Sequence, residues 1–264
     1  MTSISNEAVL LRHDEGGIAT LTLNRGNKFN ALSRELMSAV QDALDDIAED
    51  SSVRVVVLAG AGKAFCAGHD LSEMRADPGA EAMTALFSQC SKMMMTLTRI
   101  PQPVIARVHG MATAAGCQLV AQCDLAIAAE EATFATSGIN VGLFCSTPMV
   151  AVTRNLPRKQ AMELLMTGDF IDAEAALQYG LVNKVVPQAD LDAAVAELAA
   201  KLANKSPVAM MRGKQLFYTQ LESGLEAAYQ QATEVITANM QDRETRAGID
   251  AFVEKKPMPD WEDR

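Results

Sequence analysis

The alternation of apolar and polar positions predicts strands through the first half of the chain. Two runs, at 7–12 and 17–23, are separated by Gly16-Gly17, which has the composition of a hairpin turn. Two others, at 53–58 and 104–108, are almost wholly apolar and rich in β-branched side chains, which is typical of strands buried on both faces. Shorter strands are expected at 124–129 and 133–136.

Helical periodicity lies between these strands. Ser33 is a suitable N-cap for a following helix. The apolar positions of that helix lie three or four residues apart, at Leu36, Val40, Leu44 and Ile47. A second helix passes through 93–97 and ends at Ile100-Pro101, and a third covers 115–122. Strands that alternate with helices in this order predict a parallel α/β fold built from successive right-handed turns.

The last third of the chain has only helical patterns. One apolar stripe is formed by Leu191, Val195, Leu198 and Leu202. Ser206-Pro207 can begin the next helix, and the pattern continues over 222–240 and 243–255. We therefore predict an α/β core over residues 1–200 and a helical region over 201–264. The helical region has more apolar stripes than are needed to cover a core of this size, which indicates that the chain associates with copies of itself.

Composition narrows the class of protein. Lys and Arg number 23 and Asp and Glu number 33, so the net charge of −10 argues against nucleic acid as the main partner. It does not exclude one small polyanionic ligand held by a few local cations. The five cysteines include no CxxC pair, which indicates reduced thiols without disulfides or a zinc site. The N-terminal sequence has no basic region and no apolar run reaches about 18 residues, so we expect a cytoplasmic protein without a membrane partner.

Two loops of small residues are candidates for ligand binding, each directly after a predicted strand. They cover 63–71 (KAFCAGHDL) and 109–119 (HGMATAAGCQL). Small residues let a ligand approach the backbone, and a loop that enters a helix leaves N–H groups without partners. Such donors from two loops could hold a developing oxyanion, although a loop of this kind taken alone more often reflects tight packing. Neither loop fits GxGxxG or a P-loop, which argues against those modes of nucleotide binding.

At this point the chain resembles the enoyl-CoA hydratase/isomerase (crotonase) family, collinearly over nearly its whole length. The similarity rests on short motifs: LNR at 23–25, NAL at 30–32, AFCAGHDL at 64–71, PVIA at 103–106, AGCQL at 115–119 and CD at 123–124. Further matches follow at Phe134, Gly142, LMTG at 165–168, AEAALQYGL at 173–181 and FVEKK at 252–256.

The resemblance implies a spiral of ββα turns followed by a helical trimerisation region, commonly assembled as a dimer of trimers. It implies an enzyme of the lyase or isomerase type in fatty-acid metabolism, with coenzyme A as part of the substrate and neither a separate cofactor nor a metal. The backbone N–H groups of His69 and Ala115 would bind the thioester carbonyl. The positions that would contact CoA are Arg25, Lys28, Phe65, Ala67, Gly68, Asp70, Leu71 and, from a neighbouring subunit, Lys255.

The sequence departs from the family at both hydratase carboxylates. The two glutamates that activate water would fall at Gln118 and Gly138. An amide cannot take a proton near neutral pH and glycine has no side chain, so hydratase activity is doubtful. Two alternatives stay open: an acyl-CoA decarboxylase of the same fold, and a non-catalytic acyl-CoA-binding protein.

Other polar side chains near the two loops have ordinary explanations. Asp70 and Asp124 are expected to cap turns. His69 is either a surface imidazole or a neutral acid–base group beside the thioester. Cys145-Ser146 lacks the surroundings of an activated nucleophile.

Overall fold

Two sheets form the centre of the computed structural model, which describes residues 8–261. The six-stranded sheet has the order β1-β2-β3-β5-β7-β10, and the four-stranded sheet has the order β4-β6-β8-β9. Only the β1–β2 and β8–β9 pairs are antiparallel. Consecutive strands such as β3 and β4, or β5 and β6, belong to different sheets. Each turn of the chain therefore adds one strand to each sheet, which is the expected crotonase-type spiral.

The strands are short and their bounds follow the apolar runs. They are β1 Leu10–Glu15, β2 Ile18–Leu23, β3 Val55–Gly60, β4 Ala64–Cys66, β5 Val104–Val108, β6 Met111–Thr113, β7 Leu125–Ala129, β8 Thr133–Ala135, β9 Ile171–Asp172 and β10 Lys184–Val186. The predicted hairpin is confirmed, with positive φ at Gly16 and Gly17. The prediction for the first strand began at residue 7, outside the described residues. β1 is an edge strand with mostly exposed residues, so its apolar signal was weak.

Eleven helices are described between residues 8 and 261. They are α1 Arg34–Glu49, α2 Leu71–Ala76, α3 Ala80–Arg99, α4 Ala115–Gln122, α5 Ser146–Asn155, α6 Arg158–Thr167, α7 Ala173–Tyr179, α8 Leu191–Ala203, α9 Pro207–Leu221, α10 Leu225–Asn239 and α11 Arg243–Val253. Short 3₁₀ turns occur at Gly26–Lys28, Ser137–Val141 and Gln188–Asp190. Ser33 caps α1 by accepting the Leu36 N–H, as predicted. Sequence analysis missed β4, β6 and α2, because glycine-rich loops hide strands and a helix this short. It also made no prediction for α5, α6, α7, β9 and β10.

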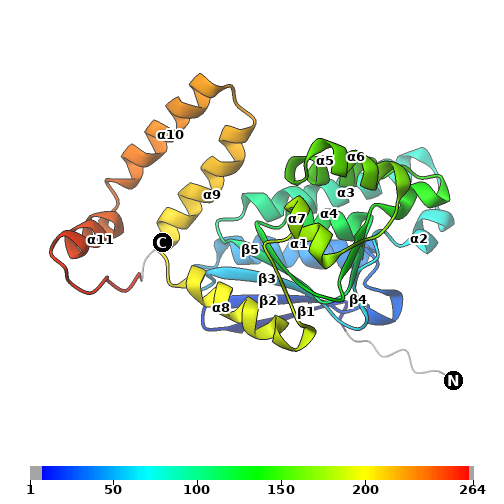
Figure 1. Cartoon of the computed structure of the whole chain (residues 1–264), viewed down its shortest axis with the longest axis horizontal. Helices are drawn as coiled ribbons and strands as arrows, with labels where there is room; N and C mark the ends of the chain where they lie inside the picture. Colours follow the sequence, from blue (N-terminus) through cyan, green and yellow to red (C-terminus); the bar gives the residue numbers. More distant parts are fainter. Residues whose placement is uncertain (1–7, 262–264) are drawn as a thin grey trace.

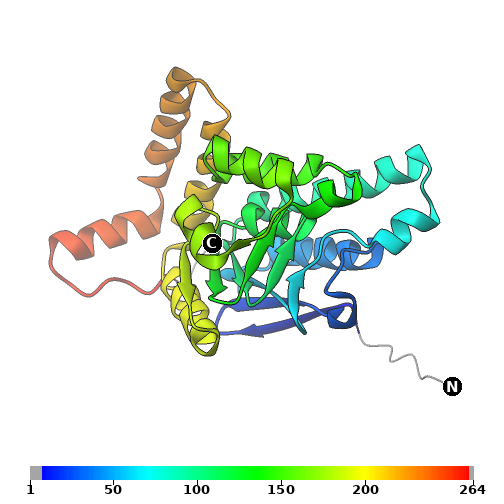
Figure 2. The same cartoon turned by 45° about the vertical axis from the view of Figure 1, so that its right-hand side comes forward.

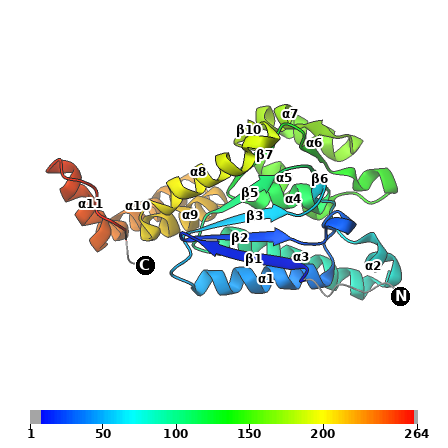
Figure 3. The same ribbon diagram turned by 90° about the horizontal axis from the view of Figure 1, so that it is seen from below.

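Both faces of the larger sheet are covered, which explains the wholly apolar strands. On one face, Val56 and Leu58 of β3 pack with the buried stripe of α1. On the other face, Val55 and Val57 pack with Leu191 and other residues of α8. Figure 3 shows α1 and α3 on one side of this sheet and α8 on the other. Loops 67–71 and 114–116 follow β4 and β6 of the smaller sheet, whose buried residues Phe65 and Ala112 belong to the same hydrophobic cluster as α1.

The last three helices leave this core as an arm (Figures 1 and 2). The domain boundary predicted at residue 200 falls near the end of α8, and it remains a prediction. Asp124 anchors α9 to the core. Its carboxylate accepts hydrogen bonds from Lys214 Nζ at 2.6 Å and from the Tyr218 hydroxyl at 2.8 Å. Asp124 also accepts the Val104 N–H at 2.7 Å. Its role is therefore wider than the turn cap expected from sequence.

All five cysteines are free and buried. Within the described residues, no group of His, Cys, Asp and Glu side chains could hold a metal ion. No helix in that part of the chain is long and apolar enough to cross a membrane.

Candidate active site

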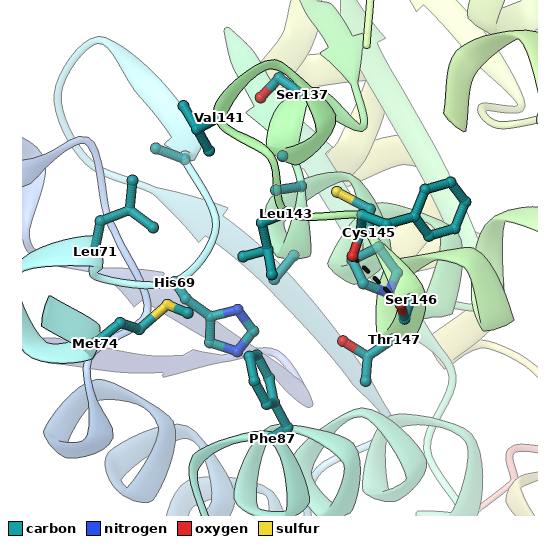
Figure 4. A pocket seen from close by; sticks show the side chains of 16 residues that line it. His69, Leu71, Met74, Phe87, Ser137, Val141, Leu143, Cys145, Ser146 and Thr147 are labelled. Atoms are coloured by element: carbon teal, nitrogen blue, oxygen red, sulfur yellow. Dashed lines mark hydrogen bonds between the residues drawn. The ribbon is translucent and has the colours of Figure 1, made fainter. Parts of the chain in front are cut away.

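A cavity of about 400 Å³ lies where the two predicted loops meet. Its walls come from residues 67–74, from Phe87 on α3, from the start of α4 and from residues 137–148. Figure 4 shows His69 pointing into its centre, between Phe87, Leu143 and Thr147. None of the described residues that line it is Asp, Glu, Lys or Arg. Chemistry in this cavity therefore depends on backbone groups and neutral side chains.

The first free backbone donor is the N–H of His69. Leu32 forms an isolated parallel bridge with His69. The Leu32 N–H donates to the Gly68 carbonyl at 2.7 Å, and the Asp70 N–H donates to the Leu32 carbonyl at 3.1 Å. Because strand N–H groups alternate in direction, the His69 N–H points away from Leu32. It has no acceptor among residues 8–261, so it can donate to a ligand.

The second free donor is the N–H of Ala115 at the first position of α4. The preceding residue, Ala114, has φ 52° and ψ −119°, a conformation that L-residues rarely adopt. Ala114 is held there because its N–H donates to the Ala135 carbonyl at 2.9 Å and its carbonyl accepts the Gln118 N–H at 3.1 Å. The first N–H groups of a helix have no intrahelical acceptor, and the Ala115 N–H has no other acceptor among residues 8–261. Fixed backbone strain of this kind is typical of functional sites.

Glycine at two positions lets the two loops touch. A Cβ on Gly68, whose φ is +89°, would lie 3.2 Å from the Ala115 nitrogen. A Cβ on Gly116 would lie 2.0 Å from the Cys66 carbonyl oxygen, so α4 packs directly on β4. The backbone around the His69 N–H and that around the Ala115 N–H are consequently in contact. The structure thus brings together the two donors that sequence analysis selected.

The two positions expected for glutamates differ in their surroundings. Gln118 lies inside α4, is only 4% exposed and does not line the cavity. Its Oε1 atom is buried and has no hydrogen-bond partner in the part of the chain that the structure describes. Gly138 does line the cavity, but a Cβ there would lie 2.5 Å from the Leu143 carbonyl oxygen and 2.9 Å from Cys145 Sγ. Neither position presents a group that could activate water.

The His69 imidazole is a cavity group, and the interpretation as a surface side chain is wrong. Burial lowers its pKa to about 4, so the ring is neutral at physiological pH. Its plane meets Phe87 edge-on, with ring centroids 5.3 Å apart. Its Nε2 atom is buried and has no partner among the described residues. The ring can therefore donate or accept one hydrogen bond inside an apolar cavity.

The predicted CoA-contacting residues differ in their surroundings. Ala67 and Leu71 line the cavity, and Gly68 lies between them. Phe65 is completely buried in β4 and supports the loop from behind. Lys28 is exposed. Arg25 and Asp70 form an ion pair of 2.9 Å, and Asp70 caps α2 by accepting the Ser72 N–H, as expected.

Lys255 follows α11, at the end of the arm remote from α2 and α3 (Figure 1). It does not reach the cavity of its own chain. Its predicted contact from a neighbouring subunit stays a prediction. Cys145 and Ser146, which sequence analysis placed near the pocket, do line it. Phe87, Leu143 and Thr147 were missed, because they come from segments that only the tertiary structure brings to the loops.

Known proteins resemble this chain over nearly its whole length. The family model described as enoyl-CoA hydratase/isomerase matches residues 13–264. The chain belongs to this family. It is 52% identical to a solved enoyl-CoA hydratase of Mycobacterium smegmatis, with a TM-score of 0.95 over 96% of this chain and 99% of that one.

Other relatives are the proteins named enoyl-CoA hydratase domain-containing protein 3, mitochondrial. The human protein is 42% identical over 93% of this chain and 80% of its own length. Its solved structure has a TM-score of 0.93, covering 95% of this chain and 99% of that one. The zebrafish (Danio rerio) protein is 40% identical over 97% of this chain and 88% of its own length.

The names of these relatives contradict the predicted cytoplasmic location. The five vertebrate proteins of this group are all named mitochondrial. The prediction rested on reduced thiols and on the N-terminal composition. Buried free cysteines indicate only a reducing compartment, so they do not separate the cytoplasm from the interior of an organelle.

Proposed function

We propose that this cavity binds a coenzyme A thioester with its carbonyl oxygen between the N–H groups of His69 and Ala115. The observation that carries the proposal is the contact between two loops, each with a free backbone donor, at an apolar cavity. Donors fixed in this way favour the negative oxygen of a thioester enolate over the neutral carbonyl. One such donor contributes about 2.7–4 kcal/mol to the transition state.

The same site is poorly equipped for hydration, and we place the chain in a subgroup that lacks both hydratase glutamates. The lining residues include no carboxylate. Gln118 can neither take nor give a proton near neutral pH, and Gly138 has no side chain. General acid–base catalysis contributes about 10²–10⁴-fold to such reactions. Loss of both groups should leave enolate stabilisation with little hydration.

Decarboxylation of a malonyl-type thioester is the second candidate. Loss of CO₂ produces an enolate directly, so it uses the oxyanion donors without a base that activates water. The neutral His69 ring, with its unpartnered Nε2 atom, adds a group that can meet the acyl substituent. A protein that binds acyl-CoA without turnover is the remaining alternative.

We also propose that the chain associates with copies of itself through the arm. The arm exposes large apolar side chains on all three helices, including Phe217, Leu225, Tyr229, Ile236 and Phe252. Exposed apolar groups this numerous are typical of an interface between subunits.

A turnover screen tests the proposed chemistry. Wild-type protein is incubated with crotonoyl-, malonyl- and methylmalonyl-CoA, and loss of the enoyl absorbance or release of CO₂ is followed. We expect slow hydration or none, and Gln118→Glu should raise it only modestly because its carboxyl would be buried. Wild-type hydration with kcat of about 10 s⁻¹ or more would contradict the assignment of the missing groups. Calorimetry with acetyl-CoA that shows no binding would contradict the thioester site itself.

A further inference from the structure

Both terminal nitrogens of the Arg25 guanidinium are hydrogen-bonded within this chain. Its Nη2 donates to Asp70 Oδ2 at 2.9 Å, and its Nη1 donates to the carbonyl oxygen of Ala31. The Arg25 side chain is only 18% exposed, and the Asp70 side chain is 12% exposed. Asn30, which is completely buried, holds the Arg25 N–H through Oδ1 at 2.9 Å. A phosphate that took the place of Asp70 at Nη2 would have to displace a largely buried carboxylate.

The two residues that accept hydrogen bonds from Arg25 are direct neighbours of the Leu32–His69 bridge, one on each segment. Ala31 immediately precedes Leu32, and Asp70 immediately follows His69. Leu32 and His69 are the two residues of the isolated bridge. The guanidinium therefore crosslinks both segments one residue away from the His69 N–H. No other side chain among the described residues is hydrogen-bonded across this bridge at both segments.

Asp70 has no spare carboxylate oxygen to rotate toward solvent. Its Oδ1 accepts the Ser72 N–H at 3.0 Å while Oδ2 accepts from Arg25. Burial raises the pKa of the Asp70 carboxyl, but the hydrogen bonds from Arg25 and Ser72 outweigh burial and leave the pKa below its ordinary value. The carboxylate is thus fixed as an anion between Arg25 and the start of α2. The peptide between His69 and Asp70 is fixed with it.

We propose that Arg25 and Asp70 are positioning residues, which set the direction of the His69 N–H by clamping the Leu32–His69 bridge, and that Arg25 is not a phosphate contact. The proposal rests on the proposed thioester site and assigns it a supporting pair. Lys28, which is exposed and lies three residues further along the chain, keeps its ammonium available for a polyanionic ligand. Functional groups must be held to within about 0.5 Å, so a loosened bridge loses one carbonyl hydrogen bond.

The test uses two probes that differ only in the phosphates and the nucleoside. They are 4-dimethylaminocinnamoyl-CoA and the corresponding pantetheine thioester, whose absorbance moves to longer wavelength when the thioester carbonyl accepts hydrogen bonds. The variants are Arg25→Met, Asp70→Asn and the double variant. Arg12→Met is the matched control, because it removes an arginine from an ion pair with Asp14 on the exposed edge strand β1.

We expect wild type and the control to shift the absorbance of both probes. Arg25→Met and Asp70→Asn should each reduce the shift and weaken binding of both probes equally, by about 2- to 10-fold, which corresponds to one neutral hydrogen bond. The double variant should be no worse than either single variant, because the two residues act as one unit. Asp70→Asn keeps the size of the side chain, so it also reports on a folded protein if Arg25→Met is unstable.

Three results would overturn the proposal. In the first, Arg25→Met weakens the CoA thioester alone and leaves the shift intact, which would make Arg25 a phosphate contact. In the second, both single variants keep the full shift. The third comes from crystal structures of wild type and Asp70→Asn without ligand. The proposal predicts that the distance between the backbone nitrogens of His69 and Ala115 differs between them by about 0.5 Å or more. An unchanged distance refutes the clamp even if no thioester binds, whereas a wild type that binds neither probe refutes only the proposed function.

Discussion

A single methyl group at position 138 should destabilise the protein. In Gly138→Ala the new Cβ would lie 2.5 Å from the Leu143 carbonyl oxygen and 2.9 Å from Cys145 Sγ. Real Cβ atoms essentially never approach another heavy atom this closely, so the surroundings must move. The φ of Gly138 is outside the left-handed region, so contacts alone set the cost.

The neighbouring backbone has little freedom to move. The Leu143 N–H donates to the Gly138 carbonyl at 3.0 Å, which closes residues 138–143 into a loop. Cys145 precedes α5 and is anchored by that helix. Inserting one extra carbon into a packed site costs about 1–3 kcal/mol. Because the contact is with backbone rather than with a flexible side chain, we expect a loss of about 2–3 kcal/mol of unfolding free energy.

Urea unfolding measures this loss, and Gly213→Ala is a matched control. Gly213 lies inside α9, and a Cβ there meets nothing within 4 Å. Alanine in a helix interior is favoured over glycine by about 0.8–1 kcal/mol, so the control should gain stability. A Gly138→Ala variant within about 0.5 kcal/mol of wild type would refute the steric argument. The same crowding means that Gly138→Glu should not by itself create a hydratase.

Three further predictions follow from buried or exposed groups. Lys214→Met should lower the free energy of unfolding by about 3–5 kcal/mol, measured by heat or urea, because it leaves the Asp124 side chain, 14% exposed, without its cation. Arg154→Met removes an exposed ion pair and should cost less than about 1 kcal/mol. Equal losses in the two variants would contradict the argument. Burial lowers the pKa of His69 from 6.5 to about 4, so between these pH values the unfolded chain binds a proton that the folded chain does not. The free energy of unfolding of wild type should therefore fall by up to about 3 kcal/mol relative to that of His69→Gln as pH falls from about 6.5 to about 4. Parallel curves of stability against pH would show that the ring is not buried in solution. Light scattering at micromolar concentration should give a mass several times 28.2 kDa, and a clean monomer would show that the arm's apolar side chains serve another purpose.

The sequence determined most of the architecture, because apolar periodicity is local. The stripe of Leu36, Val40, Leu44 and Ile47 predicts α1, and all four residues are buried in it. Strand β3 was predicted from its apolar run and is buried on both faces, as that run indicated. The small-residue pattern selected the two loops, and the resemblance to the family selected His69 and Ala115 within them. A helix start and a glycine-rich turn leave free N–H groups wherever they occur.

The tertiary structure decided what surrounds those donors. The pairing of Arg25 with Asp70 joins residues 45 positions apart, and no local pattern distinguishes it from a cation waiting for phosphate. The Gly138 site is filled by Leu143 and Cys145 through a close contact that a residue-by-residue match to relatives does not reveal. His69 is neutral because Phe87 and the cavity walls bury it. The Arg25–Asp70 pair, the crowding at Gly138 and the burial of His69 all depend on segments distant in sequence. Only the folded chain therefore reveals them.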